Sequence, residues 1–116
     1  MPTEPERFTP LKPDVFAVLL VLLRGDAHGY AIMRDAPAQS TGTGRLQAGA
    51  LYRILARLLD DGLIGEVESE SSAETTDQRR RNYRITEFGR EVAAAEARRM
   101  SEILALGQAN ELLERT

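Results

Sequence analysis

The spacing of apolar residues changes twice along this chain, and no other feature limits the fold as much. Up to Asp61, apolar side chains recur at helical spacing in three stretches, which the turns RGDAHG and TGTG separate. From Leu63 the spacing falls to every second residue, in LIGEVESE and again in RNYRIT, which predicts the two strands of a hairpin. Helical spacing returns after Thr86. The predicted order is therefore three helices, a hairpin and a long final helix.

The first predicted helix begins between Pro10 and Pro13, because proline suits the first turn of a helix, and it ends near Arg24. It is apolar on most of its sides, so other parts of the structure must cover it. Its apolar run, VFAVLLVLL, is far shorter than the about 20 residues that cross a membrane. We therefore expect a buried helix and no membrane partner.

The second predicted helix begins at Tyr30, and Pro37 ends or kinks it because proline removes a backbone hydrogen bond. The third helix is predicted from about Gln47 to Asp61, and Gly62 is placed to cap its C-terminus. Leucines line the side of the third helix that should be buried: Leu51, Leu55, Leu58 and Leu59.

Thr86 is the predicted N-cap of the final helix, which continues past Leu106. The apolar stripe of this helix is narrow, and nothing in the rest of the chain is left to cover it. We therefore expect the same helix of a second copy as its partner. The residues expected in this dimer contact are Val92, Ala93, Ala97, Met100, Ile103 and Leu104.

Three helices followed by a two-stranded wing form the winged helix-turn-helix arrangement. The predicted fold is mostly α with a small β-hairpin, and the final helix is added for dimerisation. We expect a flexible N-terminal arm over residues 1–9, the winged helix-turn-helix domain over 10–86, and the dimerisation helix with its tail over 87–116.

The charge of the chain gives mixed indications about nucleic acid. Its net charge is -3 and its pI is about 5.2, whereas a DNA-binding domain often has a pI above about 9. Every basic residue except Lys12 is an arginine, and the planar guanidinium group matches phosphate and guanine well. A genome rich in G and C would produce the same bias, so composition alone does not decide the partner.

The third predicted helix carries candidate DNA-contacting residues on the side opposite its leucines. Arg53 and Arg57 lie one turn apart, and arginine to guanine is the commonest specific contact in the major groove. Small residues in the first turn would let the helix backbone approach DNA. The alternative is a solvated face on which Arg57 pairs with Asp60 or Asp61. The expected DNA-binding residues of this helix are Gln47, Ala48, Gly49, Ala50, Tyr52, Arg53 and Arg57.

The predicted hairpin is acidic on its outgoing strand and basic on its return strand. We expect Arg79, Arg80 and Arg81 to contact DNA phosphates, as a wing lying on the sugar-phosphate backbone would. The alternative is that these arginines pair with the glutamates of the other strand, although such surface pairs contribute only about 0–1 kcal/mol. Arg84 lies nearer the body of the domain and could equally be structural.

Two tyrosines and the single histidine complete the candidate residues. The phenol of Tyr52 could bind a phosphate, or its ring could pack on the second helix. Tyr30, at the start of the second helix, is the remaining expected DNA contact. We expect His28 to cap a helix or pack in a turn. With one histidine and no cysteine, no metal site and no cofactor is expected, and no catalytic group of residues supports an enzyme.

Three motifs resemble those of the PadR-type transcriptional regulators, over about residues 11–106. HGYAIMRD resembles the family's opening of the second helix, GALYRILARLLDDGLI resembles its recognition helix, and RRRNYRITEFG resembles its return strand and the start of the next helix. The chain departs from the family at two positions. Arg53 stands where the family often has proline, and Pro37 falls inside a helix that is usually continuous.

The resemblance implies a bacterial homodimer of the family's short subgroup, which represses transcription from a roughly two-fold DNA operator and works in the cytoplasm with the nucleoid. The dimer contact would add part of the first helix, including Phe16. Family members commonly release DNA when a small aromatic or lipophilic effector binds near that contact. Phe16, Phe88, Met100 and Leu104 would line such a cavity, or simply form the dimer core. The alternative function is a winged helix that binds another protein and no DNA.

Overall fold

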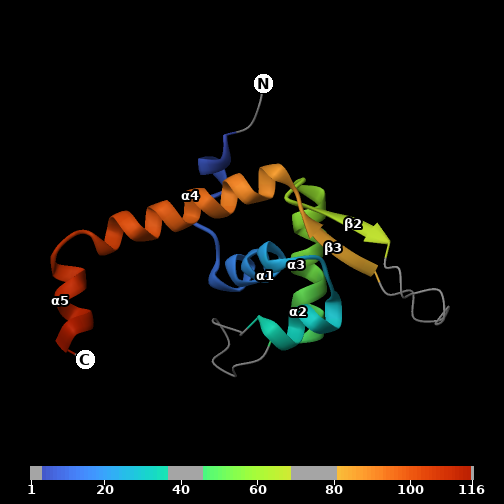
Figure 1. Ribbon diagram of the computed structural model, residues 1–116, viewed down its shortest axis with the longest axis horizontal. Coiled ribbons are helices and arrows are strands. Elements are labelled where there is room, and N and C mark those ends of the chain that lie inside the picture. Colours follow the sequence, from blue (N-terminus) through green and yellow to red (C-terminus); the bar gives the residue numbers. More distant parts are fainter. Residues whose placement is uncertain (1–3, 37–45, 69–80, 116) are drawn as a thin grey trace.

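The change of apolar spacing appears in the structure as helices, a small sheet and a long final helix. A computed structural model describes residues 4–36, 46–68 and 81–115. In chain order the elements are η1 (Pro5–Phe8), α1 (Pro13–Arg24), β1 (Ala27–His28), α2 (Gly29–Asp35), α3 (Ala48–Asp60), β2 (Ile64–Glu68), β3 (Arg81–Ile85), α4 (Glu87–Leu104) and α5 (Gln108–Arg115) (Figure 1). The predicted fold class, a mostly helical winged helix-turn-helix with a long C-terminal helix, is confirmed.

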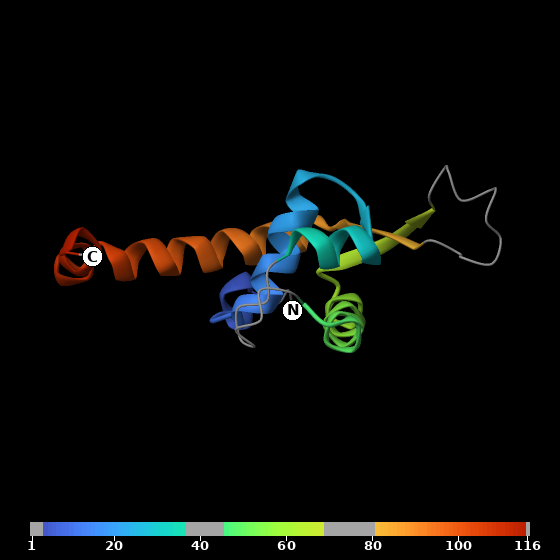
Figure 2. The ribbon, with the colours of Figure 1, turned by 90° about the horizontal axis from the view of Figure 1, so that it is seen from below.

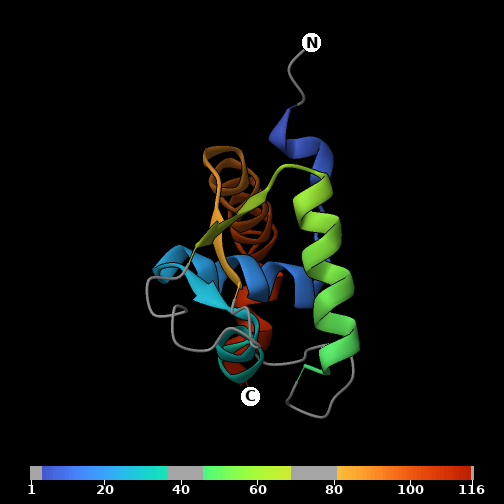
Figure 3. The ribbon, with the colours of Figure 1, turned by 90° about the vertical axis from the view of Figure 1, so that its right-hand side faces the viewer.

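The hydrophobic core lies between α1, α2, α3 and the sheet. Val18, Leu19 and Leu22 of α1 are almost fully buried at its centre. The predicted leucine stripe of α3 faces them, with Leu51, Leu55 and Leu58 buried and Leu59 half-buried. These leucines hold one side of α3 against the body, so the opposite side faces outward. α3 lies along one edge of the molecule (Figure 3).

The sheet has three strands where the apolar spacing predicts two. Strand β3 lies in the middle, with Glu66 of β2 opposite Tyr83 on one side and Ala27 of β1 opposite Tyr83 on the other. β1 lies in the stretch RGDAHG, where the sequence predicts only a turn, so this prediction is corrected. A strand of two residues is too short to show an alternating pattern, and only its pairing with β3 defines it.

Thr86 and Gly89 join the sheet to α4. The predicted N-cap is confirmed, since the Thr86 hydroxyl accepts a hydrogen bond from the Gly89 N–H at 2.9 Å and donates one to the Gly62 carbonyl at 2.7 Å. The Thr86 N–H also donates to the Leu63 carbonyl at 3.0 Å. Gly62 has a φ of 78° after the end of α3, the left-handed conformation typical of glycine, so its predicted capping place is confirmed as well.

The N-terminal segment packs on α4, which corrects the expected flexible arm. The ring of Phe8 meets the ring of Phe88 edge to face, with centroids 5.6 Å apart. The Leu11 N–H donates a hydrogen bond of 3.0 Å to the Glu96 carboxylate. The sequence of this segment is polar and contains prolines, so it does not indicate the contact. A single phenylalanine, Phe8, makes it. Residues 1–3 lie outside the described residues.

Glu96 is a nearly buried carboxylate, 2% exposed, in the middle of α4. Besides the Leu11 N–H, it accepts hydrogen bonds from Arg99 Nη2 at 2.6 Å and Nε at 3.2 Å. The Arg99 guanidinium and then the Leu11 N–H hold the pKa of Glu96 below its ordinary value, against the opposing effect of burial. The charged carboxylate therefore fastens the N-terminal segment to α4.

Glu96→Gln is expected to lower the free energy of unfolding by about 1–3 kcal/mol near neutral pH, because a charged hydrogen-bonded network loses its anion. Since the pKa of Glu96 is lower in the folded than in the unfolded state, its contribution is complete above the ordinary pKa of 4.5 and is lost as the pH falls through the folded pKa. Urea unfolding across this acidic range should show that the free energy of unfolding falls more steeply with decreasing pH for the wild type than for the variant. Glu91→Gln, at an exposed position of α4, is the control. Parallel pH curves for wild type and Glu96→Gln would contradict this role.

The second half of α4 extends beyond the rest of the fold, and α5 lies at its far end (Figures 1 and 2). α4 ends at Leu104, slightly before the predicted limit, and Gly107 separates it from α5. Two residues expected in the dimer contact are corrected, because Val92 and Ala93 are buried in the core of their own chain. The part of the chain that the structure describes contains no helix with the length and apolar character needed to span a membrane.

Candidate nucleic-acid interface

The outward side of α3 presents most of the residues expected to contact DNA. Of the seven, six are exposed: Gln47, Ala48, Gly49, Tyr52, Arg53 and Arg57. Ala50 is half-buried and lines a groove on the inner side of α3, so it does not belong to this surface. The predicted set omits Ala56, which is also exposed. Helical spacing could have indicated its exposure, because Ala56 lies one turn after Tyr52. Figure 2 shows α3 end-on at the margin of the fold.

The two arginines of this surface differ in their partners. Arg57 Nε lies 3.3 Å from Asp61 Oδ2, which is the pairing that the alternative interpretation expects. The Arg57 side chain is 79% exposed, so the pair contributes little to stability and can exchange for a phosphate. Arg53 forms no ion pair with any residue that the structure describes. Arg53 is therefore the cation of α3 most available to a ligand.

Tyr52 packs on the start of α2, one of the two roles considered for it. A Cβ atom added at Gly29 would lie 2.6 Å from the Tyr52 hydroxyl and 3.2 Å from the adjoining ring carbon. The ring thus rests on the glycine backbone, which explains the absence of a side chain at this position. Because Tyr52 is still 52% exposed, its outer side remains open to solvent beside Arg53.

His28 has the expected structural role as the N-cap of α2. Its Nδ1 accepts a hydrogen bond from the Ala31 N–H at 3.3 Å, and its ring stacks on Tyr30 with centroids 6.5 Å apart. This places the exposed Tyr30 ring at the start of α2. A hollow of about 210 Å³ lies between α2 and the start of α3, and its lining includes Tyr30, Arg34, Gln47 and Ala48. The Gln47 side chain makes no capping hydrogen bond, which leaves the first N–H groups of α3 available.

The arginines of the wing are also paired where the structure describes them. Arg81 Nη1 lies 3.1 Å from Glu66 Oε2 on the neighbouring strand, as the alternative of pairing with strand glutamates expects. Arg84 binds both carboxylate oxygens of Asp26, with a shortest distance of 2.7 Å, and holds the pKa of Asp26 below its ordinary value. Arg84 thus joins β3 to the turn before β1, a structural role. Arg79 and Arg80 lie outside the described residues.

Tyr83 lies behind this surface, between the wing and the core. It is buried, and burial raises the pKa of its phenol, with Glu66 and Tyr52 adding to the effect. Tyr83 therefore stays neutral around physiological pH and packs as part of the core. Within the described ranges, no cluster of three or more His, Asp or Glu side chains could hold a metal ion.

Comparison with known proteins agrees with this geometry. The PadR-like family of transcriptional regulators matches residues 18–95, from α1 into α4. A transcriptional regulator from Clostridium thermocellum has a similar structure, with a TM-score of 0.63 and 24% sequence identity over 79% of this chain and 84% of that chain. RosR from H. salinarum is similar with a TM-score of 0.63 and 23% identity over 93% of this chain and 91% of RosR.

PadR from Bacillus subtilis, solved in complex with operator DNA, has a TM-score of 0.58 and 20% identity over 73% of this chain and 45% of PadR. No curated protein sequence matches the chain significantly. The structural matches support the winged helix-turn-helix fold, and the family match extends over more than half of the sequence. The chain therefore belongs to the PadR-like family of transcriptional regulators, which bind DNA and are not enzymes.

Proposed function

We propose that this regulator is a homodimeric repressor that binds a roughly two-fold operator, with α3 of each protomer in the major groove. The observation that carries the proposal is the outward surface of α3, where exposed Arg53 lacks an ion-pair partner among the described residues while three buried leucines hold the opposite side. A helix anchored in this way can enter the groove without losing its packing. Operator binding would place the protein in the cytoplasm with the nucleoid.

In this proposal the contacts divide into base-reading and phosphate-binding groups. Arg53 and Arg57 would read bases, with Arg57 leaving Asp61. The first N–H groups of α3, the outer side of Tyr52 and the exposed Tyr30 would bind phosphates, which fits the positive end of a helix. Arg79, Arg80 and Arg81 would extend the phosphate contacts along the wing, with Arg81 exchanging Glu66 for DNA.

The second half of α4 supports the homodimer. Met100, Ile103 and Leu104 are 42–46% exposed, which is unusual for a row of large apolar side chains. Met100 shares the lining of a groove with Leu20 of α1, which is also exposed. Ala97, also expected in the contact, is exposed nearby. The α4 helix of a second copy would cover this surface and set two α3 helices about one turn of DNA apart.

A groove of about 380 Å³ between α1 and α4 is the place for the expected lipophilic effector at the dimer contact. Phe16, Leu20 and Met100 contribute to its lining, and Glu96 and Arg99 lie at its polar side. Phe88 and Leu104 do not belong to this lining, and Phe88 packs on Phe8 instead. An effector bound in this groove would alter the dimer geometry and thereby release the operator.

Binding to the regulator's own upstream DNA and to scrambled DNA, measured at two salt concentrations, tests the proposal. Operator binding should be tighter than binding to scrambled DNA and should weaken with salt, because each phosphate contact releases counterions. Equal and weak binding to both DNAs would favour the alternative of a winged helix that binds another protein, in accord with the acidic pI.

Arg53→Ala is expected to weaken operator binding by about 1–3 kcal/mol and to relax the base preference at one position of each half-site. The loss of binding free energy should be far smaller on scrambled DNA, which lacks the base that Arg53 is proposed to read. Gel-shift titrations of both DNAs measure the difference. Arg98→Ala, which removes the same charge from α4, is the control. An equal loss on operator and scrambled DNA would make Arg53 a phosphate contact.

A further inference from the structure

Gly29 is a buried glycine at the start of α2, at a place where the backbone does not require glycine. It is the first helical residue after the His28 cap. Among the glycines that the structure describes, only Gly25 and Gly62 have a positive φ. At a helical position alanine is ordinarily the more stable residue. The reason for a glycine at position 29 therefore lies in the space around it.

The space next to Gly29 is filled by the phenol end of Tyr52, which comes from α3. A Cβ atom added at Gly29 would lie 2.6 Å from the Tyr52 hydroxyl oxygen, 3.2 Å from Cζ and 3.4 Å from Cε1. All three of these nearest atoms belong to the far end of one side chain, whereas the nearest atom at Gly89 belongs to the backbone. A methyl group at position 29 would therefore displace the phenol and leave the α2 and α3 backbones in place.

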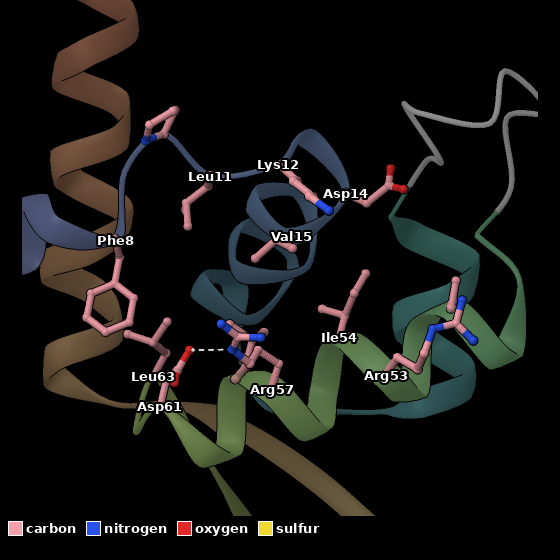
Figure 4. A pocket seen from close by; sticks show the side chains of 13 residues that line it. Phe8, Leu11, Lys12, Asp14, Val15, Arg53, Ile54, Arg57, Asp61 and Leu63 are labelled. Carbon is pink, nitrogen blue, oxygen red and sulfur yellow. Dashed lines mark hydrogen bonds and ion pairs between the residues drawn. The ribbon is translucent and has the colours of Figure 1, made fainter.

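The outward surface of α3 carries three long polar side chains, and each has a different support. Figure 4, which looks into the groove on the inner side of α3, shows Arg57 beside Asp61 and Arg53 apart from this pair. Arg53 Nη1 lies 3.8 Å from the place of a Cβ at Gly49, so this side chain extends back along α3. Tyr52 rests instead on the backbone of a second helix. A backbone support cannot change rotamer, so the position of Tyr52 is fixed more firmly than that of either arginine.

The hydroxyl of Tyr52 is available to a ligand. It forms no hydrogen bond with any residue that the structure describes, and the residue is 52% exposed. A tyrosine hydroxyl can donate a hydrogen bond to an oxygen of a DNA phosphate, and such contacts fix the register of a protein on the duplex. The packing on Gly29 therefore determines where this donor lies.

We propose that Gly29 is a positioning residue for DNA binding, which places the Tyr52 hydroxyl on a phosphate of the DNA backbone. The inference rests on the proposed function, because it takes α3 as the helix that enters the major groove. With glycine at position 29, the phenol lies against α2 and its hydroxyl stays at one place beside the outward surface. A side chain at position 29 forces the phenol into another rotamer and takes the hydroxyl away from the phosphate. Both helices of the helix-turn-helix thus define a single phosphate contact.

The contact between Gly29 and Tyr52 is tested first in the absence of DNA. NMR of protein labelled in glycine and tyrosine should show NOEs between the Gly29 Hα protons and the ring protons of Tyr52. Gly29→Ala should shift the ring signals of Tyr52, while its circular dichroism and its urea midpoint stay close to those of the wild type. A folded wild type without these NOEs would overturn the proposal, whether or not Gly29→Ala folds.

A double-mutant cycle on operator DNA tests whether Gly29 acts through the hydroxyl. Tyr52→Phe should weaken binding about tenfold, because a hydrogen bond to a charged phosphate is lost. Gly29→Ala should cause a similar loss by itself. Added to Tyr52→Phe, it should cause less than about a twofold further loss, since the atom at 2.6 Å is gone. Losses that multiply to about a hundredfold in the double variant would show that Gly29 acts independently of the hydroxyl, contrary to the proposal.

Scrambled DNA and salt separate a displaced phenol from a distorted helix-turn-helix. The hydroxyl is uncharged and binds phosphate, so Gly29→Ala should lose equal affinity on operator and scrambled DNA and keep the salt dependence of the wild type. A loss confined to the operator would indicate a changed angle between α2 and α3 and would overturn the positioning role.

Gly65→Ala is the matched control, because it adds the same methyl group where no atom lies within 4 Å. It should bind both DNAs like the wild type. A wild type that binds neither DNA would overturn the proposed function and this role with it. Normal operator binding by both the wild type and Gly29→Ala would overturn only the role of Gly29.

Discussion

Gly89→Ala should destabilise the folded protein by about 3 kcal/mol, although alanine is the better helix former by about 1 kcal/mol. The added Cβ would overlap the Leu63 carbonyl oxygen and lie 2.8 Å from Ile85 Cγ1. The close atom at Leu63 belongs to the backbone, so no side-chain rotation can relieve the overlap.

The Leu63 carbonyl has little freedom to move. It accepts the hydrogen bond from the Thr86 N–H, and the Thr86 hydroxyl is bound in turn to Gly62 and Gly89. To admit the methyl group, α4 would have to move away from the base of the wing and break this network. Gly89 is therefore required by the close approach of α4 to the loop between α3 and β2.

Gly49→Ala is the matched control, because Gly49 also lies in a helix and the nearest atom to its added Cβ is a flexible Arg53 Nη1 at 3.8 Å. This change should leave stability the same or raise it by up to about 1 kcal/mol. Urea unfolding of both variants measures the difference. Equal stability of Gly89→Ala and the wild type would show that α4 does not approach Leu63 this closely.

Met100→Glu should convert the proposed dimer to monomer, with a dimer dissociation constant at least about 100-fold higher. In one chain Met100 is 42% exposed, so the carboxylate is tolerated and the fold is kept. In the proposed dimer the same position faces the second copy. An unpaired carboxylate there would be desolvated, which disfavours the dimer. Operator affinity should fall when the dimer is lost, because one protomer offers a single α3 to the DNA.

Sedimentation velocity at several concentrations measures the change, and unfolding curves show whether the monomer is intact. Ala94→Glu is the control, since Ala94 is exposed on a different side of α4. If Met100→Glu remains dimeric while Ala94→Glu dissociates, the dimer contact lies on the side of α4 that carries Ala94. A wild type that is monomeric at all concentrations would overturn the homodimer.

Most helices and strands could be predicted because their signals are short-range. The leucines of α3 recur at helical spacing, so Leu51, Leu55 and Leu58 are buried as expected. Thr86 and Gly62 are caps whose partners lie close to the helix ends. For the same reason the outward surface of α3, with Arg53 and Arg57, could be predicted from the face opposite the leucines.

The contacts between distant parts of the chain could not be predicted. The pairing of β1 with β3, the hydrogen bond from Leu11 to Glu96 and the contact of Phe8 with Phe88 all join residues far apart in sequence. A periodic pattern says which side of a helix is apolar but not which neighbour covers it. The pattern of α4 therefore assigns Val92 and Ala93 to a contact with a second copy, whereas their own chain buries them.

The sequence by itself determined the order of elements, the caps and the charged surface of α3, because each depends on residues within a few turns or on one periodic face. Only the tertiary structure decided which arginines are paired, why Gly29 and Gly89 lack side chains, and that a groove lies behind α3. These features depend on the approach of separate backbones and on the space left between them. Packing of the whole chain sets both, and no local pattern of residues records them.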